Sequence, residues 1–433
     1  MALSDIKNKL KKTTLSKPFG VIKKITPTAL IAQGLTPSIG DIVKIVSSNH
    51  QILGMVTSLD ENQFTVTPFS FLEGFKTGDK IYLDENGMQI PVGKGLLGRV
   101  VNPFMNPIDG KGEIEFDTKY PIMRKPISPL KRGVINEVFE TKVKTIDGLL
   151  TCGKGQKLGI FAGSGVGKST LMSMIVKGAD AEIKVIALIG ERGREIPEFI
   201  EQNLGGDLTN TVLIVATSDD SALMRKYGAF SAMAVAEYFK DQNKDVLFLM
   251  DSVTRFAMAQ REIGLAMGEP PTSKGYPPSA IMLLPQLMER AGKEKDKGSI
   301  TAFFTVLVEG DDTSADPIAD QARSILDGHI ILSRELTDNG IYPPINILNS
   351  ASRVMNNVVT QEHLQKAQKF KKLYSLLKEN EVLIRIGAYQ KGVDPELDEA
   401  INKKQAMENF LKQTPDELIP FNQTLALLNR IIV

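Results

Sequence analysis

The spacing of apolar and polar residues divides the chain into regions, and the first contains short alternating segments. Between Phe19 and Leu83, apolar and polar residues alternate over short runs that Pro, Gly, Asn and Asp separate. This period of two predicts half-buried strands, and several strands at close spacing predict a small β-barrel or sandwich. No catalytic cluster stands out, so the region is expected to serve assembly rather than chemistry. The expected strands are GVIKKI, TALIAQG, DIVKIV, ILGMVTSL, QFTVTPF and DKIYL.

A second region follows a crossing rich in Gly, Pro and Asn at 93–112, which we interpret as a hinge. It contains continuous apolar runs that alternate with long helical stretches such as 221–240. Continuous apolar runs are typical of parallel strands buried on both faces. Their alternation with helices predicts a doubly wound α/β nucleotide-binding domain. The expected strands lie at 158–161, 185–189, 212–215, 246–250 and 302–308.

Strand signals disappear after about residue 356, where a helical period replaces them. Gly387 and Gly392 mark a break within this third region. Helices are expected at 360–380, 395–412 and 415–432. The patterns divide the chain into a tail (1–18), a β-barrel domain (19–88), an α/β domain (89–355) and a helical domain (356–433).

The N-terminal tail carries Leu3, Ile6 and Leu10 at helical spacing, with lysines between them. This pattern predicts a short amphipathic helix that could bind a partner or an anionic membrane surface. A frayed terminal tail explains the same residues equally well. The sequence leaves both interpretations open.

Composition narrows the class of protein. The chain has 433 residues, of which 42% are hydrophobic and 24% charged, and a net charge of +1 gives no basic field for nucleic acid. Its single cysteine, Cys152, excludes an internal disulfide and fits a reducing compartment. The sequence has no apolar run of about 18 residues and no signal-peptide core, so we expect a cytoplasmic protein.

The segment KLGIFAGSGVGKSTL at 157–171 combines a short apolar strand, a glycine-rich turn and the start of a helix. Glycines let successive backbone N–H groups converge at a helix N-terminus, which suits a phosphate chain. Lys168 is expected to reach the β- and γ-phosphates, and Ser169 to hold Mg²⁺. The alternative is a glycine-rich loop without a ligand. The predicted nucleotide-binding residues of this loop are Gly163, Ser164, Gly165, Val166, Gly167, Lys168, Ser169 and Thr170.

Two carboxylates follow apolar strands further along the chain. Asp251 ends VLFLMD, where a carboxylate can organise Mg²⁺ through its water shell; the alternative is a cap of the next turn. Glu191 follows VIALIG within GERGRE. A carboxylate there can polarise a water that attacks the γ-phosphate, and the alternative is a surface charge in a loop.

Three other side chains are candidates for contact with a nucleotide. Arg255 lies about one helical turn after Asp251, so both could face the phosphates. Tyr342, between Gly340 and Pro343, could stack on adenine or could be a core or turn tyrosine. Arg353 is a candidate arginine finger, with a structural salt bridge as the alternative.

Several motifs together resemble one family. PPINILNSAS resembles the signature of the rotary ATP synthase α/β-type subunits. FAGSGVGKST, GERGREIPEFIE, DSVTRFAMAQREIGLAMGEPPTSKGYPPS and LPQLMERAG resemble the flagellar protein-export ATPase, and injectisome ATPases of type III secretion share most of them. The resemblance extends from about Phe19 to the C-terminus. AGSGVGKS differs from the usual GGAGVGKT of the synthase catalytic subunit, which favours the secretion branch.

The resemblance implies a role for each matching residue. In the synthase, the catalytic and finger roles fall on different subunits, whereas this single chain holds both sets, as a homohexamer requires. The matching positions are Lys168 (phosphate), Ser169 (Mg²⁺), Glu191 (catalytic carboxylate), Arg192 (phosphate-site arginine), Asp251 and Arg255 (second acidic motif and its arginine), Tyr342 (adenine) and Arg353 (finger donated across the interface).

The resemblance also implies an architecture and a set of partners. The fold would be α/β, a RecA-like P-loop NTPase core with an N-terminal β-barrel and a C-terminal helical domain, and ATP or ADP and Mg²⁺ would be bound. The implied partners are other copies in a six-membered ring, a stator-like regulator at the N-terminus, a central stalk protein, export substrates with their chaperones and an export gate at the inner membrane. No nucleic acid is expected.

The leading hypothesis is therefore an ATP-hydrolysing motor that powers flagellar type III protein export. The same engine in a virulence injectisome is the close alternative, since no single residue separates the two. A non-catalytic nucleotide-binding ring subunit is disfavoured by Glu191. An RNA translocase related to Rho ranks low because the barrel segment lacks an aromatic and basic strand array for stacking bases.

Overall fold

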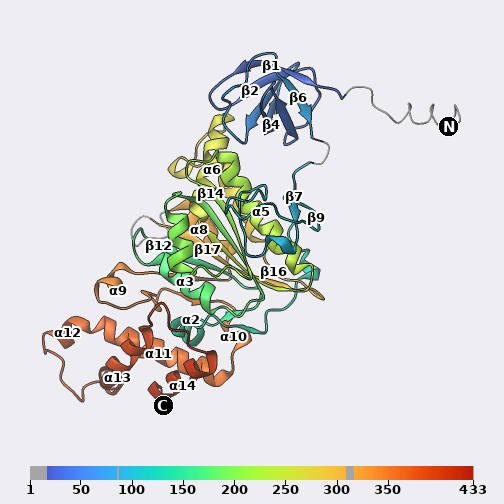
Figure 1. Cartoon of the computed structure of the whole chain (residues 1–433). Coiled ribbons are helices and arrows are strands. Elements are labelled where there is room, and N and C mark those ends of the chain that lie inside the picture. The colour runs from blue at the N-terminus through green and yellow to red at the C-terminus, as the bar shows by residue number, and fades with distance from the viewer. Residues whose placement is uncertain (1–16, 85–86, 309–315, 433) are drawn as a thin grey trace.

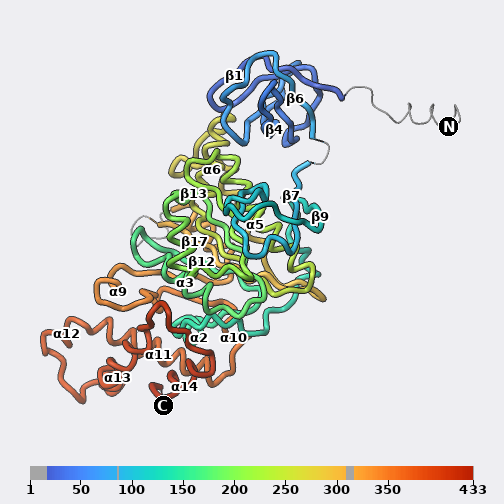
Figure 2. The backbone as a smooth tube through the Cα atoms, viewed as in Figure 1, coloured from blue at the N-terminus to red at the C-terminus, as the bar shows by residue number. Residues whose placement is uncertain are grey.

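The computed structural model describes residues 17–84, 87–308 and 316–432. A β-barrel lies at one end, a large sheet with helices forms the middle, and a group of helices lies at the other end (Figure 1). The described chain runs from the barrel end to the helical end (Figure 2). The expected N-terminal amphipathic helix lies almost wholly outside the described residues. None of the helices in the described ranges is long and apolar enough for a membrane span.

The six alternating segments form a closed barrel with the strand order β1-β2-β5-β4-β3-β6. Alternate side chains such as Ile22, Val43 and Val66 fill its interior, which confirms the period of two. Gly54 is required where strands approach closely, because a Cβ atom there would lie 2.5 Å from the Val66 side chain. The strands are β1 (Gly20–Ile25), β2 (Leu30–Gln33), β3 (Ile42–Val46), β4 (Gln51–Leu59), β5 (Phe64–Pro68) and β6 (Lys80–Leu83).

The central sheet has the order β19-β18-β12-β17-β15-β13-β14-β8, and only the edge strand β19 on this path runs antiparallel. All five expected strands are present. Segment 93–112, which we interpreted as a hinge, also contributes the edge strand β8 to this sheet. The strands are β8 (Val100–Val101), β12 (Lys157–Ala162), β13 (Ile183–Glu191), β14 (Thr211–Thr217), β15 (Asp245–Asp251), β17 (Ser299–Leu307), β18 (Gly328–Ile331) and β19 (Ala351–Ser352).

Helices cover both faces of this sheet, so its strands are apolar on both sides. Along β12, for example, Phe161 belongs to one hydrophobic core and Ile160 to the other. The first core contains α5, α6 and α7, and the second contains α3 and the C-terminal helices. The helices are α3 (Lys168–Gly178), α5 (Ala222–Lys240), α6 (Val253–Ala266), α7 (Pro278–Met288) and α8 (Pro317–Ile325).

The C-terminal region consists of helices, as expected, but the last one begins later than predicted. It starts at Phe421 rather than near 415, because a proline at 420 disfavours helical geometry at Ile419. The Gln413 side chain holds the preceding turn by donating hydrogen bonds to the carbonyls of Lys142 and Glu417, both at 2.7 Å. The helices are α11 (Gln361–Glu379), α12 (Glu381–Arg385), α13 (Pro395–Leu411) and α14 (Phe421–Ile431).

Short elements connect these parts. The helix α2 (Lys144–Leu149) packs against α11, α13 and α14 and so joins the C-terminal helices to the central domain. The other short elements are β7 (Gln89–Val92), β9 (Thr118–Pro121), β10 (Val138–Phe139), β11 (Cys152–Gly153), β16 (Gly292–Lys293), α4 (Glu195–Glu198), α9 (Arg334–Asp338) and α10 (Met355–Val358).

Candidate active site

The glycine-rich turn lies between the end of β12 and the start of α3. Gly165 and Gly167 have φ values of 75° and 91°, a left-handed region that glycine adopts without strain. Val166 between them is buried and anchors the turn in the core. The turn is placed at the positive end of the α3 dipole, where backbone N–H groups have no partner within the helix. This geometry suits an anionic phosphate chain.

Three predicted residues from different segments meet next to this turn. The Lys168 ammonium lies 2.5 Å from an Asp251 carboxylate oxygen and 3.8 Å from a Glu191 oxygen. Asp251 ends β15 and Glu191 ends the neighbouring strand β13, so parallel pairing places both carboxylates at the same edge of the sheet. Lys168 is therefore held between two carboxylates, and the phosphates of a nucleotide would replace them as its partners.

The two carboxylates differ in their surroundings. Thr305 on β17 donates a 2.7 Å hydrogen bond to the same Asp251 oxygen that contacts Lys168. No hydroxyl in the described ranges donates such a hydrogen bond to Glu191. Burial and the nearby Asp251 charge raise its pKa to about 7, although Lys168 opposes this rise. A carboxylate with a pKa near neutrality is suited to accept a proton or to orient a water.

Ser169 and Asp251 are the donors expected for Mg²⁺. Ser169 is exposed at the start of α3, on the helix that begins with Lys168. A hydroxyl oxygen beside carboxylate oxygens is a donor set that Mg²⁺ prefers. The residues present therefore fit this ion.

Arg255 lies near the carboxylates but does not pair with them. Its side chain packs over Gly190, where an added Cβ atom would lie 2.8 Å from the Arg255 Cβ. The buried Nε atom has no hydrogen-bond partner, and Nη1 lies 3.9 Å from the sulfur of Met258. The Arg255 guanidinium therefore has unused donors beside the strand that carries Glu191.

Tyr342 lies at the rim of the same turn. An added Cβ atom on Gly167 would lie 4.0 Å from the Tyr342 ring and 3.6 Å from Pro344. Tyr342 is 42% exposed, so its ring remains open to a ligand. Arg334 at the start of α9 donates a 3.0 Å hydrogen bond to the Ser164 carbonyl and supports the turn. The sequence pattern did not single out Arg334 or Thr305, and neither lies in a predicted motif.

Two predicted residues lie away from these three. Arg192 is exposed, and its guanidinium lies 3.9 Å from a Glu195 carboxylate oxygen. Arg353 lies at the opposite edge of the sheet. Its backbone N–H donates a hydrogen bond to the Asp327 carbonyl, and the backbone N–H of Asp327 donates one to the carbonyl of Lys157 at the start of β12. The phosphate turn follows the other end of β12, about 16 Å away for a six-residue strand. Arg353 therefore cannot serve the phosphate turn of its own chain.

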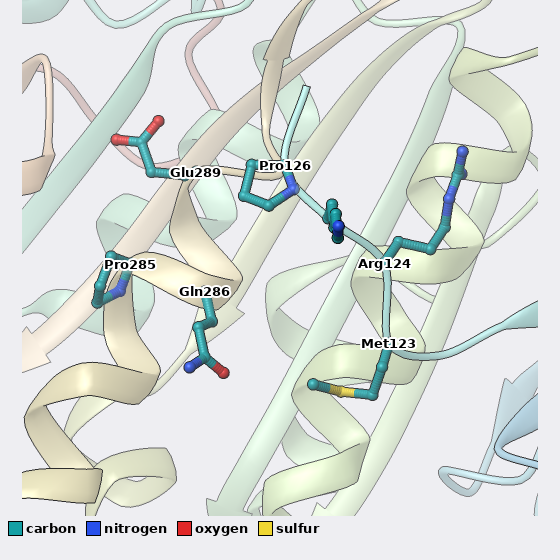
Figure 3. Close-up of a pocket in the computed structure, with 7 residues that line it drawn as sticks. Met123, Arg124, Pro126, Pro285, Gln286 and Glu289 are labelled. Atoms are coloured by element: carbon teal, nitrogen blue, oxygen red, sulfur yellow. The ribbon is translucent and has the colours of Figure 1, made fainter. Parts of the chain in front are cut away.

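The structure also contains cavities outside this site. One, of about 510 Å³, is lined by Met123, Arg124 and Pro126 from an extended segment and by Pro285, Gln286 and Glu289 from α7 and its end (Figure 3). Glu289 contacts the ammonium of Lys157 at 2.9 Å, so this cavity lies at the sheet edge opposite the phosphate turn.

Comparison with known proteins identifies the family. The model of the ATP synthase alpha/beta family nucleotide-binding domain matches residues 142–352, and that of the T3SS EscN ATPase C-terminal domain matches 359–430. The chain is 65% identical to the flagellum-specific ATP synthase of Helicobacter pylori strain J99, over all of both chains. The chain belongs to this family of P-loop ATPases.

Other members of this ATPase family support the assignment. The type 3 secretion system ATPase of Xanthomonas euvesicatoria is 43% identical over 98% of this chain and 97% of its own. The assembled ATPase EscN from the type III secretion system of enteropathogenic E. coli superposes with a TM-score of 0.91, at 46% identity over 96% of this chain and 100% of EscN. EscN in complex with its central stalk EscO gives a TM-score of 0.89, at 45% identity over the same shares of both chains. Among these, the flagellar protein is the most similar to the chain.

Proposed function

We propose that this ATPase hydrolyses ATP to ADP and phosphate to power flagellar type III protein export. The observation that carries the proposal is the meeting of Lys168, Glu191 and Asp251 at one edge of the sheet beside the glycine-rich turn. The 65% identity to a flagellum-specific ATP synthase favours the flagellar system over the injectisome, whose ATPase is 43% identical.

Each residue of the site has a role in this proposal. Lys168 leaves Asp251 and neutralises charge on the β- and γ-phosphates, while the N–H groups of the turn cradle the chain. Glu191 accepts a hydrogen bond from the attacking water and holds it in line with the γ-phosphate. Mg²⁺, when bound by Ser169 and through water by Asp251, supplies charge neutralisation. Nothing in this set forms a covalent intermediate, so positioning and electrostatics supply the rate.

The remaining predicted residues complete the nucleotide site. Tyr342 stacks on adenine, and Arg192 and Arg255 supply positive charge near the phosphates. Arg353 acts on the site of a neighbouring copy, which the distance from its own phosphate turn and the assembled state of the relative EscN support. The active form is then a homohexameric ring in which each site lies between two copies.

The proposed partners follow from the relatives. The complex of EscN with its central stalk EscO supports a stalk protein in the ring of this chain as well. A stator-like regulator at the N-terminus, export substrates with their chaperones, and the export gate complete the set. The ring would be cytoplasmic and would associate peripherally with the inner-membrane export apparatus.

ATP turnover by the purified chain and its Glu191→Gln variant tests this function. The variant should bind nucleotide but lose more than about 100-fold in turnover, because a neutral amide cannot take up a proton from the attacking water. Glu198→Gln is the matched control, since Glu198 is exposed on the short helix that follows, and this change should leave turnover nearly unchanged. Normal turnover by Glu191→Gln would exclude the assignment, and a wild-type chain that only binds nucleotide would indicate a non-catalytic ring subunit.

A further inference from the structure

Four basic side chains, one of them Arg353, gather around the end of α8 and the strand β18. The Arg353 guanidinium donates a 3.4 Å hydrogen bond to the carbonyl oxygen of Arg323, near the end of α8. The Arg323 guanidinium lies 5.9 Å from the ring centroid of Phe161, and that ring packs edge-on against His329 at 6.3 Å. Burial lowers the pKa of His329, and the charges of Arg323 and Arg353 lower it further. Lys371 on α11 acts on His329 in the same direction.

We call these four residues the basic cluster: Arg323, His329, Arg353 and Lys371. The basic cluster has no acidic partner within the described part of the chain. No ion pair joins Arg323, Arg353 or Lys371 to a carboxylate in residues 17–84, 87–308 and 316–432. The Arg323 Nε atom is buried without a hydrogen-bond acceptor. Many other lysines and arginines of the central domain pair with carboxylates, for example Arg290 with Glu237 at 2.8 Å. Like charges held together at low dielectric are unfavourable, so an anion from outside the chain would stabilise the cluster.

We infer that Arg323 is a second cation for the nucleotide of the neighbouring copy and that it contacts the terminal phosphate beside Arg353. The inference rests on the proposed function, in which Arg353 crosses the interface. The hydrogen bond from Arg353 to the Arg323 carbonyl holds the two residues next to each other, and Arg323 is partly exposed.

The chemistry favours a phosphate over an acidic side chain of the neighbour. A carboxylate offers two oxygens and one negative charge, whereas a terminal phosphate offers three oxygens and up to two charges. Two guanidinium groups with planar sets of donors match the larger anion better. Arg323 would then share with Arg353 the charge that develops during phosphoryl transfer.

Nucleotide affinity of the full-length assembled chain, with Mg²⁺, tests this assignment. Arg323→Ala should weaken the non-hydrolysable triphosphate AMP-PNP about 10-fold, leave ADP within about twofold and lower kcat about 10- to 100-fold, as expected for one charge-assisted contact. Arg323→Lys should retain part of the wild-type affinity for AMP-PNP and part of the wild-type kcat, because it keeps the positive charge. Arg430→Ala, an exposed arginine on the last helix, is the control and should change none of these values.

The double variant Arg323→Ala with Arg353→Ala separates direct contact from support. It should bind AMP-PNP more weakly than Arg353→Ala alone, because each arginine makes its own contact. Equal affinity would show that Arg323 acts only by holding Arg353 and would overturn the inference. An equal loss of affinity for ADP and AMP-PNP would also overturn the inference. Loss of ring assembly with unchanged nucleotide affinity would overturn it too, because it would indicate that Arg323 contacts an acidic side chain of the neighbour.

Two further comparisons keep the result interpretable. Arg323→Gln keeps the length of the side chain and decides the test if Arg323→Ala does not fold. If Arg323 variants behave like wild type while Arg353→Ala loses turnover, this inference alone fails. If Arg353→Ala also hydrolyses ATP normally, the proposed shared site fails instead.

Discussion

Lys168 connects the glycine-rich turn to the two carboxylates of the site. It balances Asp251, which Thr305 holds by a hydrogen bond, and the more distant Glu191. Without its ammonium, two carboxylates at the ends of neighbouring strands would repel each other in a partly buried site. The site is thus assembled before any ligand enters, and binding exchanges one set of partners of Lys168 for another.

The pH dependence of kcat/KM follows from Glu191. Burial and Asp251 raise its pKa to about 7, and only the ionised carboxylate can take up a proton from the attacking water. kcat/KM should therefore fall about tenfold per pH unit below this pKa and stay level above it. A profile from pH 5.5 to 9 measures this, with Glu191→Gln as the control that should lack the acidic limb. A flat wild-type profile down to pH 5.5 would contradict the role.

Thr305 should matter for catalysis although no motif contains it. Thr305→Val removes the 2.7 Å hydrogen bond to Asp251 with little change in volume, and kcat should fall about 10-fold, the worth of one hydrogen bond to a charged group. Thr301→Val is the matched control, since Thr301 lies on the same strand and its hydroxyl accepts a bond from Gly155, far from the site. The control should change stability but not kcat; equal kcat losses in both variants would contradict the prediction.

At the scale of elements, the site depends on how strands end. β13 and β15 finish side by side, and the turn after β12 finishes at the same edge, so one sheet edge gathers residues that are distant in sequence. Gly190, the residue before Glu191, has a φ of 76° and lies under the Arg255 side chain. The end of β13 therefore needs both the conformational freedom of glycine and the absence of a side chain.

Gly190→Ala should consequently damage both stability and activity. The new Cβ atom would meet Arg255 at 2.8 Å in a left-handed conformation, which should lower the free energy of unfolding by about 1–3 kcal/mol. Gly193→Ala is the control, because its Cβ atom would meet nothing within 4 Å. Chemical denaturation and turnover of both variants provide the measurement. Equal stability of the two would show that the close approach at Gly190 has no cost.

These elements also show what the sequence could predict. The strands of the central sheet were predictable because helices cover both faces and leave long apolar runs, and the barrel because most of its strands, such as β2 and β5, keep a period of two. The meeting of Lys168, Asp251 and Glu191 followed from motifs at strand ends. The two-residue strand β8 and the start of α14 were not predictable, because a tertiary pairing and a single proline decide them. Thr305 and Arg323 depend on the side-by-side placement of distant elements, which a single sequence does not display.

At the scale of the whole molecule, each chain carries the phosphate turn of one site and the arginine that would complete another. The phosphate turn lies at one edge of the central sheet, and Arg353 lies at the other. No internal movement within an intact sheet brings these edges together, so a complete site needs a second copy. Turnover should therefore rise with protein concentration more steeply than in proportion, because assembly creates sites.

Mixing two inactive variants tests this shared site most directly. Lys168→Ala lacks the phosphate lysine and Arg353→Ala lacks the finger, and each alone should turn over ATP at least about 100-fold more slowly than wild type. Mixed in equal amounts, they should recover activity, because about one quarter of the interfaces in a random ring join an intact phosphate turn to an intact Arg353. Normal turnover by Arg353→Ala alone, or no recovery in rings shown to contain both variants, would contradict the account.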